Sequence, residues 1–238
     1  MNRILQYIKS KAFKVNTNNS TLDFPSEISV LNSYSMSGIH VLKKQFALAQ
    51  DITQRNIEGD FVECGVCNGG SAATISLAFI NSNKKAWLYD SFQGLPEPEE
   101  IDGVLAKDYV GAFLGLEEKV KEAMEIAHFP KERYLIQKGW FADTFQEPLP
   151  EMISFLHIDS DWYDSVMLCL DTFYDLVSTG GIILLDDFGH WEGCREAFYD
   201  FAQKRGIKPL LERFGHTQAF WVKGRLHNRD FRGQREIP

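Results

Sequence analysis

The sequence predicts one α/β domain with a doubly wound, mostly parallel β-sheet that ends in an antiparallel hairpin. Strand-like and helix-like runs alternate through most of the 238 residues, as they do in βαβ units. Several strand-like runs end in acidic side chains, at the edge where open α/β sheets bind ligands. The last two strand-like runs leave no room for a helical crossover, so they must pair antiparallel.

The first half of the chain opens with a polar, loop-like extension over residues 1–30. A helix follows, because apolar side chains recur at helical spacing at Ile39, Leu42 and Phe46. Ser71 is a suitable N-cap for the next helix, which comes after a glycine turn. The elements expected in this half are a helix over 35–56, a strand over 60–66, a helix over 71–82 and a strand over 85–91.

The second half opens with an acidic, loop-like segment over residues 92–115, whose length is typical of a lid or a binding loop. Gly180 and Gly181 suggest a stop for the helix that precedes them. The elements expected after the acidic segment are a helix over 116–127, strands over 133–139 and 151–161, a helix over 163–181, a strand over 181–188, a helix over 193–206 and a hairpin formed by 208–215 and 217–224.

Composition and charge exclude several classes of partner. The formal net charge of −8 and the pI of about 5.3 disfavour a nucleic-acid-binding protein, which usually carries a basic stripe. No apolar run approaches the roughly 18 residues of a membrane span. The first 20 residues lack the continuous apolar region and the cleavage site of a signal peptide. We therefore expect a cytoplasmic protein with no nucleic-acid and no membrane partner.

Cys64 and Cys67 form a C-x-x-C motif, which is typical of redox pairs and of zinc sites. A redox pair needs the start of a helix, where the dipole lowers the thiol pKa, whereas this pair falls on a strand end and a turn. A zinc site needs a second closely spaced pair, and Cys169 and Cys194 each stand alone. We expect neither chemistry here.

The glycine turn between the first expected strand and its helix indicates a ligand site. It has no Lys followed by Ser or Thr, as a phosphate-binding P-loop requires, and its spacing differs from G-x-G-x-x-G. Glu63, two residues before Gly65, suits a cationic ligand such as S-adenosylmethionine, whose carboxylate can bind N–H groups at the helix start. Asp90, at the end of the next strand, can accept hydrogen bonds from ribose hydroxyls. The alternative is a turn that only packs the helix on the strand.

A group of acids ends two strands that we expect to be adjacent. Asp159 ends one strand and the pair Asp186–Asp187 ends the other, and such carboxylates repel one another at close range. A bound cation relieves this repulsion, and all-oxygen ligands favour Mg²⁺, Ca²⁺ or Mn²⁺ over zinc. Such an ion can bind a substrate hydroxyl and lower its pKa. The alternative is a set of separately solvated acids.

Histidines and tryptophans near the strand ends are further candidates for the site. We expect His157 to be a packed or hydrogen-bonded core histidine, while His190, in a loop after the acid pair, can reach the site. Trp140, Trp162 and Trp191 all come just after strand ends, where aromatic rings can wall an adenine or a substrate ring. They can equally cover the core.

Five segments between about residues 35 and 200 resemble, in order and spacing, the macrocin O-methyltransferase family of class I methyltransferases. The segments are FVECGVCNGGSA, LYDSFQGLP, QKGWFADTF, LHIDSDWYDS and GGIILLDDFGHWEGCREA. The resemblance implies a Rossmann-like fold, dependence on S-adenosylmethionine and Mg²⁺, and a metal held by Asp159, Asp186 and Asp187. Departures at Trp162 and Val166, where the family often has Leu and Thr, leave these acids intact.

The resemblance also implies where the cofactor lies. Gly139 and Trp140 are expected beside the adenine, and the segment that contains Ser35 is expected to cover the cofactor from the N-terminal side. The implied cofactor contacts are Met36, Glu63, Gly65, Ser71, Asp90, Ser91, Gly139 and Trp140.

The predicted function is that of an S-adenosylmethionine- and Mg²⁺-dependent O-methyltransferase in natural product biosynthesis. We expect a methyltransferase domain over 57–238, preceded by an N-terminal extension and helical lid over 1–56. The acceptor is a small-molecule hydroxyl, on a sugar of a glycosylated metabolite or of a polysaccharide precursor, and the family resemblance implies a homo-oligomer. Asp159 is the first choice for the general base, with His190 and Asp161 as alternatives. The competing hypotheses are an NAD-dependent oxidoreductase, whose fingerprint is missing, and an inactive cofactor-binding protein, against which the retained acids argue.

Overall fold

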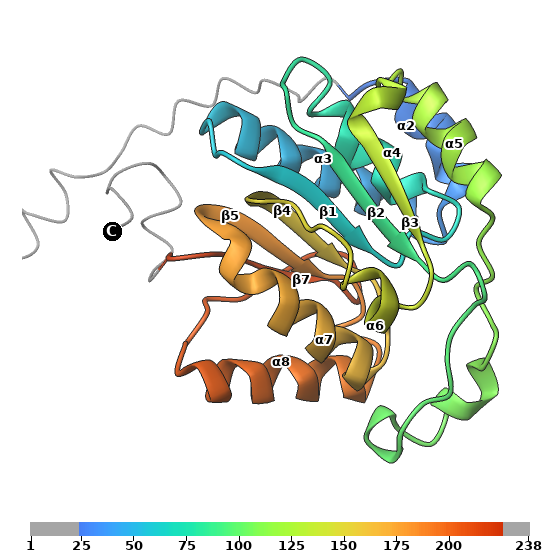
Figure 1. Ribbon diagram of the computed structural model, residues 1–238, viewed down its shortest axis with the longest axis vertical. Helices are drawn as coiled ribbons and strands as arrows, with labels where there is room; N and C mark the ends of the chain where they lie inside the picture. The colour runs from blue at the N-terminus through green and yellow to red at the C-terminus, as the bar shows by residue number, and fades with distance from the viewer. Residues whose placement is uncertain (1–23, 226–238) are drawn as a thin grey trace, which may run out of the picture.

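The computed structural model describes residues 24–225, which form an α/β fold around a seven-stranded sheet (Figure 1). The strand order is β3-β2-β1-β4-β5-β7-β6, and only the pairs that involve β7 are antiparallel. This confirms the doubly wound, mostly parallel sheet with a C-terminal antiparallel hairpin. The strands are β1 (Asp60–Cys64), β2 (Ala86–Asp90), β3 (Tyr134–Lys138), β4 (Ile153–Ile158), β5 (Val177–Leu185), β6 (Glu212–Arg213) and β7 (Ala219–Val222).

Helices cover both faces of the sheet, which gives a three-layer arrangement (Figure 1). One face carries α2 (Glu27–Leu31), α3 (Ile39–Gln54), α4 (Gly70–Leu77) and α5 (Glu117–Ile126), and the other carries α6 (Phe141–Thr144), α7 (Tyr163–Phe173) and α8 (Glu192–Arg205). Short 3-10 helices lie in the connections, over Asn32–Tyr34, Glu100–Asp102, Ala106–Tyr109, Lys131–Arg133 and Tyr174–Leu176.

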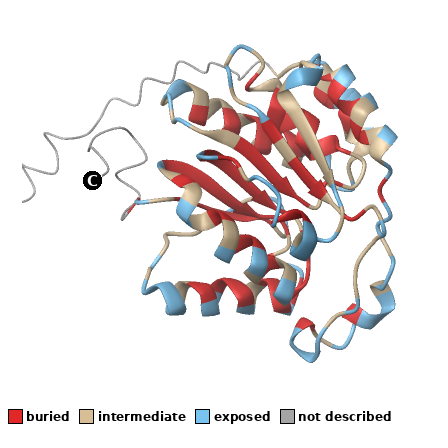
Figure 2. Cartoon of the chain, viewed as in Figure 1, coloured by how far each residue is buried: buried red, intermediate tan, exposed pale blue. Residues whose placement is uncertain are grey.

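The core consists of two large apolar clusters, one on each face of the sheet. Successive side chains of a strand point to opposite faces, so Phe61 of β1 belongs to the cluster under α3 and α4 while Val62 belongs to the cluster under α7 and α8. Because both faces are covered, the central strands are mostly apolar, and the polar side chains within them, such as Glu63 and His157, are buried as well. Figure 2 shows these strands as almost fully buried.

The helix predicted over 163–181 is wrong in its second half. The helix α7 ends at Phe173, and the residues from Val177 onward belong to β5. Val177 is β-branched, which favours extended backbone. Gly180 has a φ of +86°, and the β4–β5 register shifts near it. The glycine pair therefore marks an irregularity within a strand, a common use of glycine in sheets, and not a helix stop.

The N-terminal region contains more helix than the sequence predicted. Within the predicted extension, residues 24–30 are described and include most of α2; residues 1–23 lie outside the described part of the chain. The predicted helix over 35–56 begins only at Ile39, because Gly38 is extended and acts as its N-cap. The predicted boundary between the N-terminal region and the methyltransferase domain, at residue 56, falls in the turn between α3 and β1. Ile52 of α3 packs into the apolar cluster that covers one face of the sheet.

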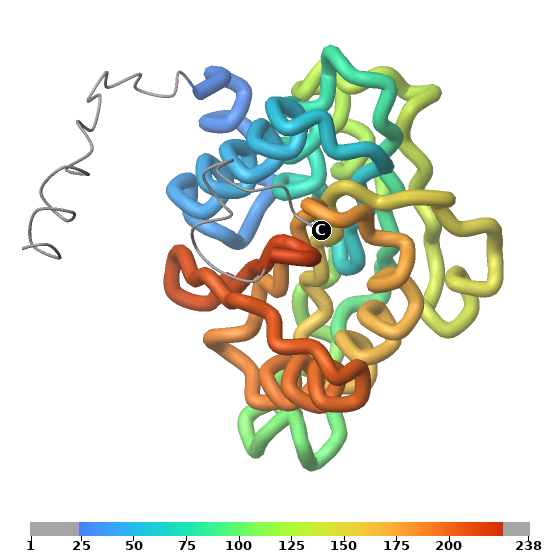
Figure 3. The backbone as a smooth tube through the Cα atoms, turned by 90° about the vertical axis from the view of Figure 1, so that its left-hand side faces the viewer, coloured from blue at the N-terminus to red at the C-terminus, as the bar shows by residue number. Residues whose placement is uncertain are grey.

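The acidic segment over 92–115, called the arm below, projects from the body of the protein in two perpendicular views (Figures 1 and 3). Its base is tied to the start of α7. The indole N–H of Trp162 donates to the carbonyl of Pro96 at 2.9 Å, and Asp102 accepts from the backbone N–H of Tyr163 at 2.7 Å. No helix within residues 24–225 is both long enough and apolar enough to cross a membrane.

Candidate active site

A cavity of about 600 Å³ lies at the carboxyl ends of the parallel strands. The strand order reverses between β1 and β4, and open α/β sheets bind their ligands at such a switch point. The glycine turn after β1, the end of β2 and the acids that follow β4 and β5 all contribute to the cavity wall. The fold thus brings the two candidate sites of the sequence, the turn and the acid cluster, to one cavity.

Gly65 and Gly70 shape the turn because no larger residue fits. Gly65 has a φ of +90°, and a Cβ built there would lie 1.7 Å from the backbone oxygen of Asp159. The ends of β1 and β4 can therefore approach each other only with glycine at this position. A Cβ on Gly70 would lie 2.6 Å from the Cβ of Ser35, so the segment before α3 rests directly on the turn.

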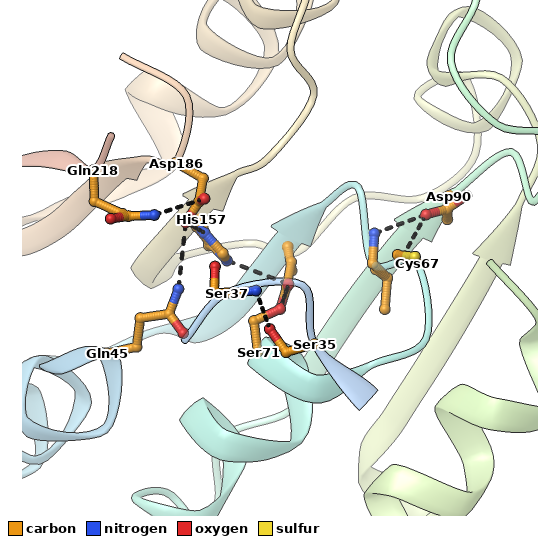
Figure 4. Close-up of polar contacts among 11 residues, drawn as sticks. Ser35, Ser37, Gln45, Cys67, Ser71, Asp90, His157, Asp186 and Gln218 are labelled. Atoms are coloured by element: carbon orange, nitrogen blue, oxygen red, sulfur yellow. Dashed lines mark hydrogen bonds and ion pairs between the residues drawn. The ribbon is translucent and has the colours of Figure 1, made fainter. Parts of the chain in front are cut away.

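Asp90 holds the turn in place. One carboxylate oxygen accepts from the backbone N–H groups of Val66 at 2.8 Å and Cys67 at 2.7 Å, and the other accepts from Phe92 at 2.6 Å (Figure 4). Asp90 also lines the cavity. A carboxylate has about four acceptor positions, so the expected contact with ribose hydroxyls stays a prediction beside this structural role.

Glu63 lies beneath the cavity wall rather than on it. Its side chain is fully buried, accepts from the hydroxyl of Ser71, and lies 3.3 Å from Nδ1 of His157. Ser71 lines the cavity, whereas Glu63 does not. The other oxygen of Glu63, Oε2, is buried without a hydrogen-bond partner. A direct contact between Glu63 and the cofactor stays a prediction.

The other expected cofactor residues surround the same cavity. Trp140 is 39 % exposed and stands at the N-terminus of α6, directly after Gly139. Met36 is 67 % exposed on the segment that covers the turn. The predicted cofactor residues that line the cavity are Met36, Gly65, Ser71, Asp90, Ser91, Gly139 and Trp140, together with Ser35.

Four carboxylates meet at the other end of the cavity. Burial, and then the negative charges of the neighbouring acids, raise the pKa of Asp159 and of Asp187 well above the usual range. Burial also raises the pKa of Asp161 to about 7, although the indole N–H of Trp191 donates to this carboxylate at 2.8 Å and lowers it. Asp186 belongs to the same group and is buried. The repulsion expected from the sequence is therefore present.

These oxygen donors fit a hard divalent cation. Ligand atoms of His157, Asp159 and Asp186 all lie within 4.8 Å of one another, and Oδ2 of Asp187 is buried without a hydrogen-bond partner. Crowded carboxylates with a free oxygen are the donor set that Mg²⁺ prefers. His157 is fully buried between two acids, with its Nδ1 3.3 Å from Glu63 and its Nε2 3.4 Å from Asp186. Both nitrogens thus lie beside carboxylate oxygens, although Nδ1 has no hydrogen-bond partner, and the metal set Asp159, Asp186 and Asp187 stays the prediction.

His157 is the core histidine that the sequence suggested. Burial alone would lower its pKa, but the charge of Glu63 and the contact with Asp186 raise the pKa to about 10. The histidine therefore links the turn to the acid cluster across β1, β4 and β5.

Two residues that contact the acid cluster were not predicted, namely Gln45 and Gln218. Both donate to the Asp186 carboxylate, from positions 141 and 32 residues away in the chain. One signal for Gln45 was present, since it is a polar residue on the buried stripe of α3, beside Phe46. Gln218 gave no such signal, because it lies in the short loop before β7.

The remaining aromatic and histidine candidates separate into two groups. His190 is exposed and lines the cavity. Trp191 also lines the cavity, but it is buried. Trp162 is only 2 % exposed and packs against Trp191 in the core, so it walls no ligand.

The cysteines show no special chemistry. All four thiols are free, and burial raises the pKa of the Cys64 and Cys67 thiols, which disfavours the nucleophilic thiolate of a redox pair. Within residues 24–225, no cysteine joins a group of three or more possible metal ligands.

The strand order and the ligand turn after β1 together define a class I methyltransferase fold. The sequence profile of the family described as Macrocin-O-methyltransferase (TylF) matches residues 2–223. The chain belongs to this family, and it is an S-adenosylmethionine-dependent O-methyltransferase.

Relatives of known activity agree with this assignment. The chain is 27 % identical over 225 residues to demethyldecarbamoylnovobiocin O-methyltransferase of Streptomyces niveus, covering 91 % of this chain and 84 % of the relative. It is 24 % identical over 233 residues to mycinamicin III 3''-O-methyltransferase of Micromonospora griseorubida, covering 90 % and 86 %.

Solved structures show the same fold. The O-methyltransferase NovP superposes with a TM-score of 0.71 at 28 % identity, covering 81 % of this chain and 83 % of NovP. The calicheamicin methyltransferase CalS11 superposes with a TM-score of 0.67 at 18 % identity, covering 87 % and 88 %.

Proposed function

We propose that this enzyme methylates a sugar hydroxyl of a small molecule with the help of Mg²⁺ bound by Asp159, Asp186 and Asp187. The observation that carries the proposal is the single cavity in which the glycine turn after β1 faces a cluster of buried carboxylates. The free oxygen of Asp187 and the repulsion among these acids support a cation at this place. When bound, Mg²⁺ supplies a positive charge that favours the deprotonated form of an acceptor hydroxyl.

The names of the relatives support a sugar acceptor, and the lining of the cavity favours one without an anionic group. One relative, from Streptomyces olivaceus, is named for 4'-O-methylation of a dimethoxyrhamnosyl group, with 25 % identity over 205 residues covering 79 % of this chain and 75 % of the relative. Among the described residues that line the cavity there is no lysine and no arginine, while several carboxylates are present. Away from the proposed metal, a phosphate or carboxylate on the acceptor would find no lysine or arginine among these residues.

The chain's own residues would position the reactants and accept a proton. S-adenosylmethionine supplies the methyl group, and the turn held by Asp90 would orient it. Asp159 is the first candidate to accept the proton of the acceptor hydroxyl, because it lies in the acid cluster beside the site proposed for the hydroxyl. Asp161 and His190, which also line the cavity, are the alternatives. Most of the rate enhancement would come from alignment of the reactants and stabilisation of charge.

The test is methyl transfer to a panel of glycosylated metabolites, followed by mass spectrometry, with and without EDTA. We expect a methylated product that disappears with EDTA and returns with added Mg²⁺, while calorimetry shows that S-adenosylmethionine still binds after chelation. Full activity in EDTA would overturn the role of the metal. Binding of S-adenosylmethionine without turnover of any glycoside would instead support the inactive cofactor-binding alternative.

Two further parts of the sequence prediction belong to this proposal. A cytoplasmic location and a homo-oligomeric assembly both stay predictions, and size-exclusion chromatography with light scattering would measure the second.

A further inference from the structure

The Asp186 carboxylate is held by three buried side chains from different parts of the fold (Figure 4). Gln218, just before β7, donates its Nε2–H to Oδ2 at 2.9 Å. On the other oxygen, Oδ1, Nε2 of Gln45 from α3 lies at 3.5 Å and Nε2 of His157 from β4 at 3.4 Å. Both glutamines are at most 3 % exposed. The carboxylate is therefore fixed from both sides.

Each glutamine contacts Asp186 while its own amide oxygen stays without a partner. Oε1 of Gln45 and Oε1 of Gln218 are both buried without a hydrogen-bond partner. A buried polar atom without a partner is unfavourable for folding. What the glutamines supply is an N–H group for each oxygen of Asp186.

The position of the two amides on the carboxylate is what matters here. An amide N–H fixes the direction of a carboxylate oxygen and adds no full positive charge of its own. Residues that orient metal ligands in this way commonly tune metal affinity about 10–100-fold.

We propose that Gln45 and Gln218 are positioning residues that orient the Asp186 carboxylate for a divalent cation. This inference rests on the metal site of the proposed function. It assigns part of that site to the N-terminal helix α3 and to the C-terminal hairpin, both far from the acid cluster in sequence.

The test measures Mn²⁺ binding to the full-length enzyme by electron paramagnetic resonance, without acceptor. Gln218→Met and Gln45→Met remove one donor each and keep the length of the side chain. Gln203→Met, at an exposed glutamine on α8, is the matched control. We expect Mn²⁺ affinity to fall about 10-fold or more in the two site variants and to stay unchanged in the control. S-adenosylmethionine affinity should not fall in any of them, and circular dichroism should show that every variant is folded.

Three results would overturn the inference. Wild-type Mn²⁺ affinity in both folded site variants would show that the amides do not act on the metal ligand. Failure of both variants to fold would give the glutamines a purely structural role. If the wild-type enzyme itself bound no Mn²⁺, the proposed metal site would be wrong, and the positioning role would be wrong with it. Wild-type binding that is unchanged in the variants would instead contradict the positioning role alone.

Discussion

Asp90 illustrates how one side chain can serve structure and ligand binding together. It was selected from the sequence because it ends the second strand, and the structure adds that its carboxylate accepts three backbone N–H groups, two of them from the glycine turn. Removal of this side chain would therefore change the shape of the site even without a direct contact to the cofactor.

We predict that Asp90→Ala weakens S-adenosylmethionine binding at least 10-fold. Hydrogen bonds to a charged group contribute about 1.5–3 kcal/mol each, so the loss of those to Val66 and Cys67 should loosen the turn. Isothermal titration calorimetry measures the affinity, and thermal melting should show a lower melting temperature. Asp108→Ala, at an exposed acid in the arm, serves as the control. Unchanged affinity in Asp90→Ala would contradict this role for the carboxylate.

Individual site residues were predictable where chemistry and strand position coincide. Asp159, Asp186 and Asp187 end apolar strands, and the alternation of elements alone brings those strand ends to one edge of the sheet. Gln45 and Gln218 were not predictable, because their role depends on the packing of α3 and β7 around Asp186, which no local pattern encodes.

At the scale of the elements, the close approach of β1 and β4 depends on Gly65. The two strands are neighbours in the sheet, and the backbone after β4 passes so close to Gly65 that a Cβ has no space. This contact fixes the position of Asp159 relative to the turn. The geometry of the candidate site is therefore set by backbone packing before any side chain contributes.

We predict that Gly65→Ala destabilises the enzyme by about 3 kcal/mol or more, because the clash adds to the strain of a positive φ. Gly38→Ala is the matched control, since its backbone is extended and nothing lies within 4 Å of the added Cβ. The control should change stability by no more than about 1 kcal/mol. Urea denaturation followed by circular dichroism measures both, and equal stabilities would show that β1 and β4 can separate at little cost.

The arm depends in a similar way on one buried acid. Asp102 is 2 % exposed, accepts from Tyr163 at the start of α7 and, through its other oxygen, from Glu99 within the arm. It thus acts as a distant cap for α7. The arm also contacts the glycine turn, where the thiol of Cys67 donates to the carbonyl of Phe113 at 3.6 Å.

Asp102→Ala should destabilise the enzyme by about 1–2 kcal/mol, the usual effect of losing a helix cap. The same change should make the arm more sensitive to limited proteolysis, since one of its two ties to the start of α7 is lost. Asp108→Ala again provides the comparison, because that acid is exposed. Identical digestion rates for the two variants would show that Asp102 does not anchor the arm.

The element boundaries that the sequence missed depend on packing between elements or belong to very short elements. The glycine pair after α7 looked like a helix stop, and only the pairing of β5 with β4 and β7 shows that it lies within a strand. The short helices α2 and α6 are too brief to show a period. Long, strongly periodic elements such as α3 and α8 were predictable because their buried faces repeat over several turns.

At the scale of the whole molecule, the distribution of charge bears on which acceptor the proposed site would bind. The chain carries a net charge of −8, and the described lining of the cavity contains carboxylates without lysine or arginine. Arg213 lies outside this lining and donates to the backbone carbonyl of His216, which belongs to the lining. Low-dielectric walls strengthen the field of the buried acids within such a cavity. A cation held by the acids offsets part of this charge close to the ion but supplies no partner for an anionic group elsewhere on the acceptor.

We therefore predict that a phosphorylated acceptor is a poorer substrate than the neutral glycoside with the same sugar. Its kcat/KM should be lower by about 10-fold or more, because repulsion between like charges in a focused field slows association by such factors. The difference should lie mainly in KM, because the reacting hydroxyl and its surroundings are the same in both compounds. It should also shrink as salt rises from about 0.01 M to 0.15 M, where the screening length falls from about 30 Å to 8 Å. Steady-state kinetics with the matched pair at both salt concentrations provides the test, and the neutral glycoside should show little salt dependence. Equal kcat/KM for the two acceptors at low salt would show that a cationic group outside residues 24–225, or from a second copy of the chain, completes the acceptor site.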